Sequence, residues 1–162
     1  MEVVFWFVAA GGIAGWNSRA WKPLWQSFLP TGLFCFGEDV FGSQLAVVEG
    51  FKNAVLWNHE NGECFNLLVS PCELLRTVLG SGLDWIDFYS EGSLAVARLY
   101  GAVPLDSHLH WTTPLILGGR VSRDNLTVVE REQHLAGHAK LWSQVGGLPI
   151  GAVDLSSAIK RL

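Results

Sequence analysis

The apolar positions of this chain fall into short runs separated by turn residues, a pattern typical of β-strands. The first half contains five such runs, at residues 3–10, 33–36, 44–48, 54–57 and 64–68. Residues 58–62 read Asn-His-Glu-Asn-Gly, and the Asn-Gly pair supplies the positive φ angles of a tight hairpin. Residues 33–68 therefore predict a meander of about four antiparallel strands, and residues 3–10 predict a further core strand.

Helix signals flank and follow this meander. Ser70-Pro71-Cys72-Glu73 combines an N-cap serine, a proline at the first helical position and a capping-box glutamate, and it predicts a helix to about residue 79. A second capping box, at residues 127–130, predicts a helix running to about residue 145. Apolar spacing over residues 16–28 indicates a shorter helix, and residues 114–117 and 152–155 read as two more strands.

Taken together, strands in a run followed by helices indicate an α+β fold, with a mostly antiparallel sheet and helices packed on one face. With 162 residues, 49% of them apolar, the chain is long enough for one sizeable core. No internal repeat or linker-like segment interrupts it. We expect a single domain over residues 1–162, with the first thirty residues the hardest to place.

The charge is unevenly distributed along the chain, whose net charge is −4. Residues 38–91 contain nine acids and two bases, whereas residues 119–162 contain six bases and four acids. An acidic middle segment favours a basic partner, and the absence of a Lys/Arg cluster argues against nucleic acid as a ligand.

Cysteine content and hydropathy indicate a compartment. The three cysteines, Cys35, Cys64 and Cys72, are too few and too irregularly spaced for a disulfide framework. The apolar run at residues 3–10 is too short to span a bilayer, and no basic residues precede it as in a secretory signal. We therefore expect a cytoplasmic protein without membrane partners.

Two histidines form the most suggestive chemical pattern. His134 and His138 are four residues apart on the second predicted helix, where zinc ligands can share one face. Leu135 stands where a zinc hydrolase needs its general base, although His108 and His110 could complete a site. We interpret these histidines as exposed or capping side chains, and a metal-dependent hydrolase stays as an alternative.

Other candidate chemistry is weaker. The Glu38-Asp39 pair lies in a predicted turn without a neighbouring His, Ser or Cys, and only Cys72 sits at a helix start that would favour a thiolate. The paired glycines lack the spacing of a phosphate-binding loop, and the eight tryptophans are typical of a core or a protein interface. We expect no catalytic residue, no metal and no cofactor.

Residues 33–46, Leu-Phe-Cys-Phe-Gly-Glu-Asp-Val-Phe-Gly-Ser-Gln-Leu-Ala, resemble a segment of the bacterial SUKH superfamily, in which an aromatic strand runs into acidic-Asp-x-Phe-Gly-x-Gln-Phe. Further similar segments follow in the family's order, at residues 60–63, 70–79, 114–119, 124–126 and 148–152. The sequence departs from the family at Leu45, which replaces an aromatic residue, and it lacks the family's N-terminal helix motif.

The resemblance implies an α+β fold without catalytic residues, and an immunity protein that neutralises a cognate toxin, often a nuclease, by direct binding. Combining this with the charge count, we expect a basic toxin to contact six acids: Glu38, Asp39, Glu60, Glu63, Asp84 and Asp87. The alternatives are a regulatory protein-interaction module of the same fold and the hydrolase based on His134 and His138.

Overall fold

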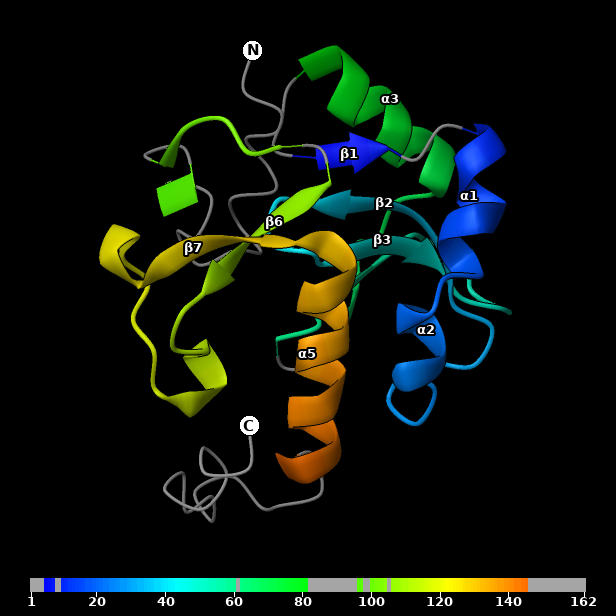
Figure 1. Ribbon diagram of the computed structural model, residues 1–162. Helices are drawn as coiled ribbons and strands as arrows, with labels where there is room; N and C mark the ends of the chain where they lie inside the picture. The colour runs from blue at the N-terminus through cyan, green and yellow to red at the C-terminus, as the bar shows by residue number, and fades with distance from the viewer. Residues whose placement is uncertain are drawn as a thin grey trace.

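A five-stranded antiparallel sheet forms the centre of the computed structural model, which describes residues 5–7, 10–60, 62–81, 96–97, 100–104 and 106–145 (Figure 1). The strands are β1 (Phe5–Phe7), β2 (Phe34–Asp39), β3 (Gln44–Val47), β4 (Val55–Trp57) and β5 (Cys64–Asn66). Their order across the sheet is their order along the chain, so the sheet is a meander. The predicted α+β class and the antiparallel meander are confirmed.

The turn between β2 and β3 is held by a buried carboxylate. Asp39 Oδ1 accepts hydrogen bonds from the backbone N–H groups of Phe41 and Ser43, at 2.9 and 2.8 Å. Gly42 in this turn has φ of 95°, and a Cβ there would lie 2.8 Å from the Nδ1 atom of His108. Only glycine therefore suits this position, because it tolerates the backbone angle and leaves room for the imidazole.

One face of the sheet is covered by three helices: α1 (Ala10–Asn17), α2 (Trp21–Leu24) and α5 (Arg131–Val145). Trp21 and Trp25 pack with Trp57 of β4, and the Trp25 and Trp57 rings meet edge to face at 4.8 Å. The indole N–H of Trp25 donates to the carbonyl of Leu135 at 2.9 Å, which ties α5 to this layer. These three tryptophans therefore belong to the core.

The opposite face is covered by α3 (Pro71–Ser81) and by a separate hairpin of β6 (Ser107–Trp111) and β7 (Leu126–Glu130). Leu45, Leu56, Leu74 and Leu109 meet there in one cluster. We expected the helices on one face, but they lie on both. The reason is that β3 and β4 are apolar at successive positions, so each face of the sheet needs a cover.

The helix starts were predicted with mixed success. The capping box of α3 is confirmed, because the Glu73 N–H donates to Ser70 Oγ at 3.3 Å and the Ser70 N–H donates to the Glu73 carboxylate at 2.9 Å. The second capping box was wrong, because residues 127–130 belong to β7 and α5 begins at Arg131. Glu130 caps α5 instead, accepting from two backbone N–H groups.

Two other predicted elements differ from the structure. The predicted helix over residues 16–28 is replaced by the end of α1 and the short α2, and the predicted strand at 114–117 is a 3-10 helix, η2 (Leu115–Leu117). A second 3-10 helix, η3 (Arg123–Asn125), precedes β7. The strand predicted at 152–155 lies outside the described residues.

Within the described ranges, no helix combines the length and apolar character needed to cross a bilayer.

Candidate functional site

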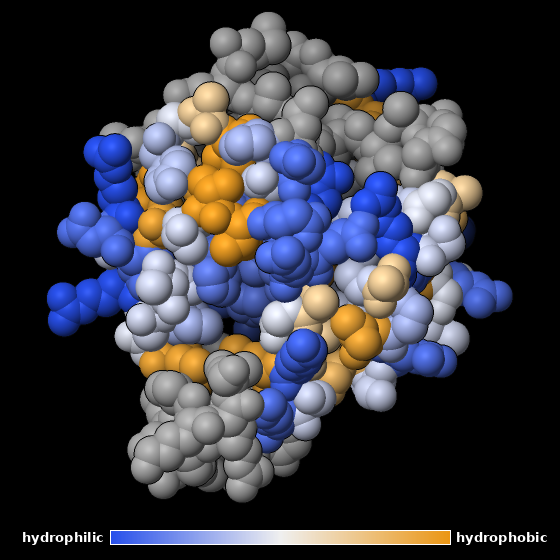
Figure 2. Space-filling view, viewed as in Figure 1, coloured by the Kyte–Doolittle hydropathy of each residue, from blue (hydrophilic) through white to orange (hydrophobic). Residues whose placement is uncertain are grey.

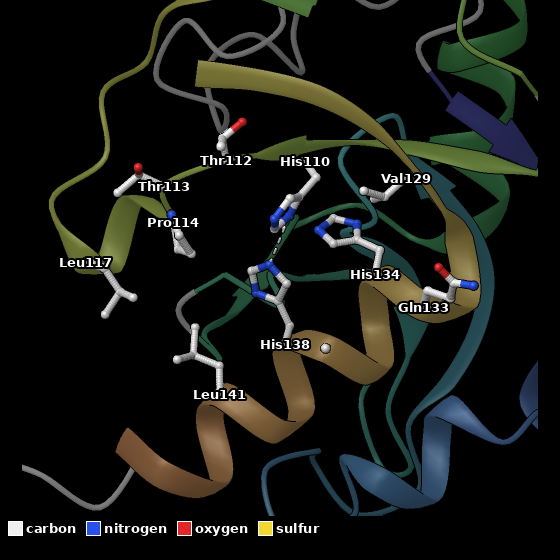
Figure 3. A pocket seen from close by; sticks show the side chains of 11 residues that line it. His110, Thr112, Thr113, Pro114, Leu117, Val129, Gln133, His134, His138 and Leu141 are labelled. Carbon is white, nitrogen blue, oxygen red and sulfur yellow. Dashed lines mark hydrogen bonds between the residues drawn. The ribbon is translucent and has the colours of Figure 1, made fainter. Parts of the chain in front are cut away.

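All five histidines of the chain meet in one place, although they come from three separate parts of the sequence. The group consists of His59, His108, His110, His134 and His138. Neighbouring ring centroids lie 4.7–5.4 Å apart. We call these five side chains, together with Glu60, the histidine centre, and Figure 3 shows three of its rings turned toward one another.

Regular secondary structure accounts for most of this convergence. His134 and His138 are one turn apart on α5, and His108 and His110 are two apart on β6, so each pair projects from one side of its element. His59 follows β4 in the hairpin turn, where the Glu60 N–H donates to the Asn58 side chain at 2.8 Å. The indole N–H of Trp142 holds the His59 carbonyl at 3.0 Å, which fixes this turn against α5.

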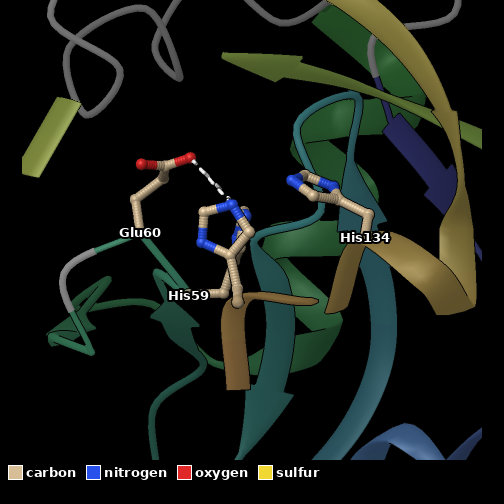
Figure 4. Close-up of side chains that lie close together, drawn as sticks. His59, Glu60 and His134 are labelled. Atoms are coloured by element: carbon tan, nitrogen blue, oxygen red, sulfur yellow. Dashed lines mark ion pairs between the residues drawn. The ribbon is translucent and has the colours of Figure 1, made fainter. Parts of the chain in front are cut away.

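Four side chains form the inner part of the centre: His59, Glu60, His134 and His138. Each offers one ligand atom within 4.8 Å of those of the others. Glu60 Oε1 lies 3.6 Å from His138 Nε2 and 3.9 Å from His59 Nε2. Figure 4 shows the Glu60 carboxylate reaching toward the imidazoles. All four are at most 8% exposed, so bulk water does not satisfy them.

A chain of polar contacts runs from this inner group to a buried acid. His134 Nδ1 lies 3.1 Å from His108 Nδ1, and His108 Nε2 lies 3.3 Å from Glu38 Oε2. A carboxylate only accepts, so this contact favours a proton on His108 Nε2, which leaves His108 Nδ1 to accept from the Nδ1–H of His134. The Nε2 atom of His134 is left with a bare lone pair directed at the inner group.

Burial sets the charge state of the centre. It is the first cause that lowers the pKa of His59 and His134 well below 6.5, and nearby histidines lower both further. Burial, with the charges of His110 and His108, lowers the pKa of His138 to about 3, and burial raises the pKa of Glu60 to about 7. At neutral pH these three imidazoles are therefore uncharged, the form in which imidazole binds metal ions.

A pocket of about 540 Å³ opens beside the histidine centre. His110, His134 and His138 form its polar wall, and the apolar side chains of Pro114, Leu117, Val129 and Leu141 line it. Figure 2 shows the surface hollowed between α5 and the segment that contains η2. The pocket gives a small molecule or ion a route to imidazoles that are otherwise buried.

The structure changes the interpretation of the residues that the sequence singled out. His134 and His138 were expected at the surface or at a helix cap, and this was wrong, since they are 4% and 3% exposed.

Of the six acids expected to face a partner, Glu38, Asp39 and Glu60 are buried, so their placement on the surface is corrected. Each has internal hydrogen-bond or ion-pair contacts that explain its burial. Glu63 is exposed, and Asp84 and Asp87 lie outside the described residues.

Sequence reasoning missed His59 as a member of the group. His59 itself was assigned only to a hairpin turn at residues 58–62, and nothing in the spacing of this turn points to α5 about 75 residues later. The spacing of the histidines was the one signal in the sequence. The chain has only five histidines, and four of them form two closely spaced pairs, His134 with His138 and His108 with His110.

No family model matches the chain, and no curated protein matches it either. Among solved structures, the chain is similar to one described as the crystal structure of Atu4351 from Agrobacterium tumefaciens, with a TM-score of 0.48 and 15% sequence identity. The aligned region covers 85% of this chain and 66% of that one, so the chain spans slightly less than two thirds of that protein's length.

Proposed function

We propose that this chain is a non-catalytic protein-binding domain, and that it acts as an immunity protein by binding a cognate toxin directly. The resemblance of residues 33–153 to the SUKH superfamily supports this role. Two of the residues that carry the resemblance serve the fold: Asp39 holds the turn between β2 and β3, and the Asn125 side chain bonds Thr113 and Arg120. These residues therefore stabilise the fold, and other residues on the surface would contact the toxin.

The observation that carries the proposal is a set of exposed apolar side chains at one end of the sheet. Phe34 begins β2, Phe51 lies between β3 and β4, and Leu68 follows β5, so the meander brings all three to the same end. They are 43%, 58% and 77% exposed, which makes them three of the five most exposed large apolar residues in the described part of the chain. Exposed aromatic and aliphatic side chains of this kind commonly form the centre of protein interfaces.

Two hydrogen bonds connect the loop that contains Phe51 to the segment that contains Leu68. The Asn53 side chain donates to Asn66 Oδ1 at 3.2 Å, which connects the loop of Phe51 to the end of β5. The Leu68 N–H donates to the same oxygen at 2.8 Å. We call Phe34, Phe51 and Leu68 the apolar end of the sheet. Burying one such side chain in an interface contributes roughly 1.5–3 kcal/mol to the binding free energy. Two buried side chains of this kind could therefore supply most of the affinity for a partner.

The experiment begins with affinity capture of the tagged chain from its native cells, washed at low and at high salt. The captured partner is then expressed alone and together with the chain. We expect the partner to stop growth alone and the chain to restore it. Replacing Phe51→Asp and Leu68→Asp together should abolish rescue, whereas Val121→Asp, at another exposed apolar position, should preserve it.

Other outcomes would favour other functions. A partner that is harmless when expressed alone would indicate a regulatory interaction module of the same fold. The pocket beside the histidine centre favours a metal-dependent hydrolase as the second candidate. Zinc-dependent hydrolysis of a generic ester or phosphoester, lost in His138→Gln, would support the hydrolase and contradict the immunity role.

A further inference from the structure

We propose that the histidine centre binds one divalent transition-metal ion through His59, Glu60, His134 and His138, and that zinc is the ion this set suits best. Three imidazole nitrogens and one carboxylate oxygen are ordinary zinc ligands. The site goes beyond the proposed protein-binding function and does not depend on it.

The spacing of the donors fits a tetrahedral ion after a small contraction. Zinc–ligand bonds of about 2.0–2.2 Å place neighbouring donors roughly 3.3–3.6 Å apart in a tetrahedron. Two observed separations, Glu60 Oε1 to His138 Nε2 at 3.6 Å and to His59 Nε2 at 3.9 Å, are already near this range. If every pair were at the 4.8 Å limit, each donor would be about 2.9 Å from the centre and would have to move inward by roughly 0.9 Å.

The donors also have unmet bonding capacity. Neither ring nitrogen of His59 has a hydrogen-bond partner among the described residues, although the side chain is fully buried. The same is true of His134 Nε2, whose side chain is 4% exposed. Each unsatisfied buried polar group costs on the order of 1–3 kcal/mol, so several in one place call for an explanation. One metal ion would take up one nitrogen of His59 and the Nε2 atom of His134 at the same time.

An outer layer of contacts prepares His134 for this role. The path from Glu38 through His108 leaves the proton of His134 on Nδ1 and its lone pair on Nε2. The direct partner of His134 is His108, and a hydrogen-bond partner behind a ligating histidine fixes its tautomer and orientation. Glu38 acts on His134 through His108. Glu38 is therefore a positioning residue for the metal, and the pocket provides the ion with an entry path.

The first test uses the full chain, stripped with a chelator and titrated with zinc chloride in a calorimeter. We expect one equivalent to bind with Kd below about 1 µM. Cobalt(II) is the second probe, and it should give the intense visible absorption of a tetrahedral site. Zinc should also raise the melting temperature of the wild-type chain, a readout that requires no variant to fold.

Matched variants then locate the site. The double change His59→Gln and His138→Gln should weaken zinc binding by at least about 100-fold and remove the cobalt spectrum. Cys64→Ser with Cys72→Ser removes the two exposed thiols and should leave both readouts unchanged. Glu38→Gln, which acts one contact further out, should weaken binding by up to about 10-fold and retain one equivalent. Circular dichroism of the chelated variants confirms that each is folded.

Three results would overturn the proposal. The first is a folded wild-type chain that binds no zinc up to about 100 µM and whose melting temperature zinc does not change. The second is a folded histidine double variant that binds as the wild type does. The third is loss of binding in the cysteine variant, which would assign the zinc to the surface thiols.

Discussion

The ion pair between Arg131 and Glu38 allows a quantitative test of the buried polar contacts around Glu38. Arg131 is the first residue of α5, and its Nε lies 2.9 Å from Glu38 Oε1. The Glu38 side chain is fully buried and that of Arg131 is 19% exposed. Replacing Arg131→Met removes the positive charge and keeps an apolar stem of similar length against Trp16, over whose ring the guanidinium lies at 5.2 Å.

The expected loss follows from the contacts that remain to Glu38. This carboxylate also contacts Gln44 Nε2 at 3.1 Å and His108 Nε2 at 3.3 Å, and neither of these partners carries a permanent charge. Removing one partner of a buried pair usually costs 3–5 kcal/mol, and the partial exposure of Arg131 places the expected value at about 3 kcal/mol. Adding Glu38→Gln removes the stranded charge, so the double variant should recover about half of the loss.

The assay is urea unfolding at pH 7.5 with chelator present, followed by the fluorescence of the eight tryptophans and by far-UV circular dichroism. The two single variants and the double variant complete a double-mutant cycle. If Arg131→Met costs less than about 1 kcal/mol, or if the double variant is no more stable than Arg131→Met, Arg131 does not stabilise the buried Glu38 carboxylate.

Two further predictions concern titration and thiol reactivity. His138 has a pKa of about 3 in the folded chain and about 6.5 when unfolded, so its contribution to stability is complete above pH 6.5 and is lost as the pH falls below it. Between pH 7 and pH 5 the chelated wild type should therefore lose roughly 2 kcal/mol more than His138→Gln, as measured by urea unfolding, and parallel profiles would contradict this. Burial raises the pKa of the Cys35 thiol to about 12, whereas Cys64 and Cys72 are exposed. A thiol reagent at pH 8 should modify two cysteines in the native chain and the third only after unfolding, and native labelling of Cys35, located by mass spectrometry, would be the contrary result.

Local features of the fold could be predicted because local physics determines them. The hairpin of β4 and β5 and the capping box at Ser70 depend on backbone angles and hydrogen bonds within a few residues. Residues 127–130 show the limit of this reasoning. Their capping-box pattern is real, but pairing of Leu126–Glu130 with Ser107–Trp111 gives five residues strand partners and moves the helix start to Arg131.

The histidine centre could not be predicted because its members are joined only by tertiary packing. The spacing of His134 and His138 was visible, but their burial depends on Trp25, Trp57 and the hairpin of His59, which lie far away in the sequence. The same limit applies to the acids. A count of charges cannot distinguish Glu38, buried against Arg131, from Glu63, which is exposed.

The distances along the chain between these histidines have a consequence for folding kinetics. The hairpins that contain β2 to β5 close over short loops, whereas His59 meets α5 only after a closure of about 75 residues, and such long-range contacts generally form late. An ion that binds the completed centre would then leave the folding rate unchanged and slow unfolding, because its stabilisation is absent from the transition state. Persistence of the native chain at elevated temperature would thus depend on the metal supply after synthesis.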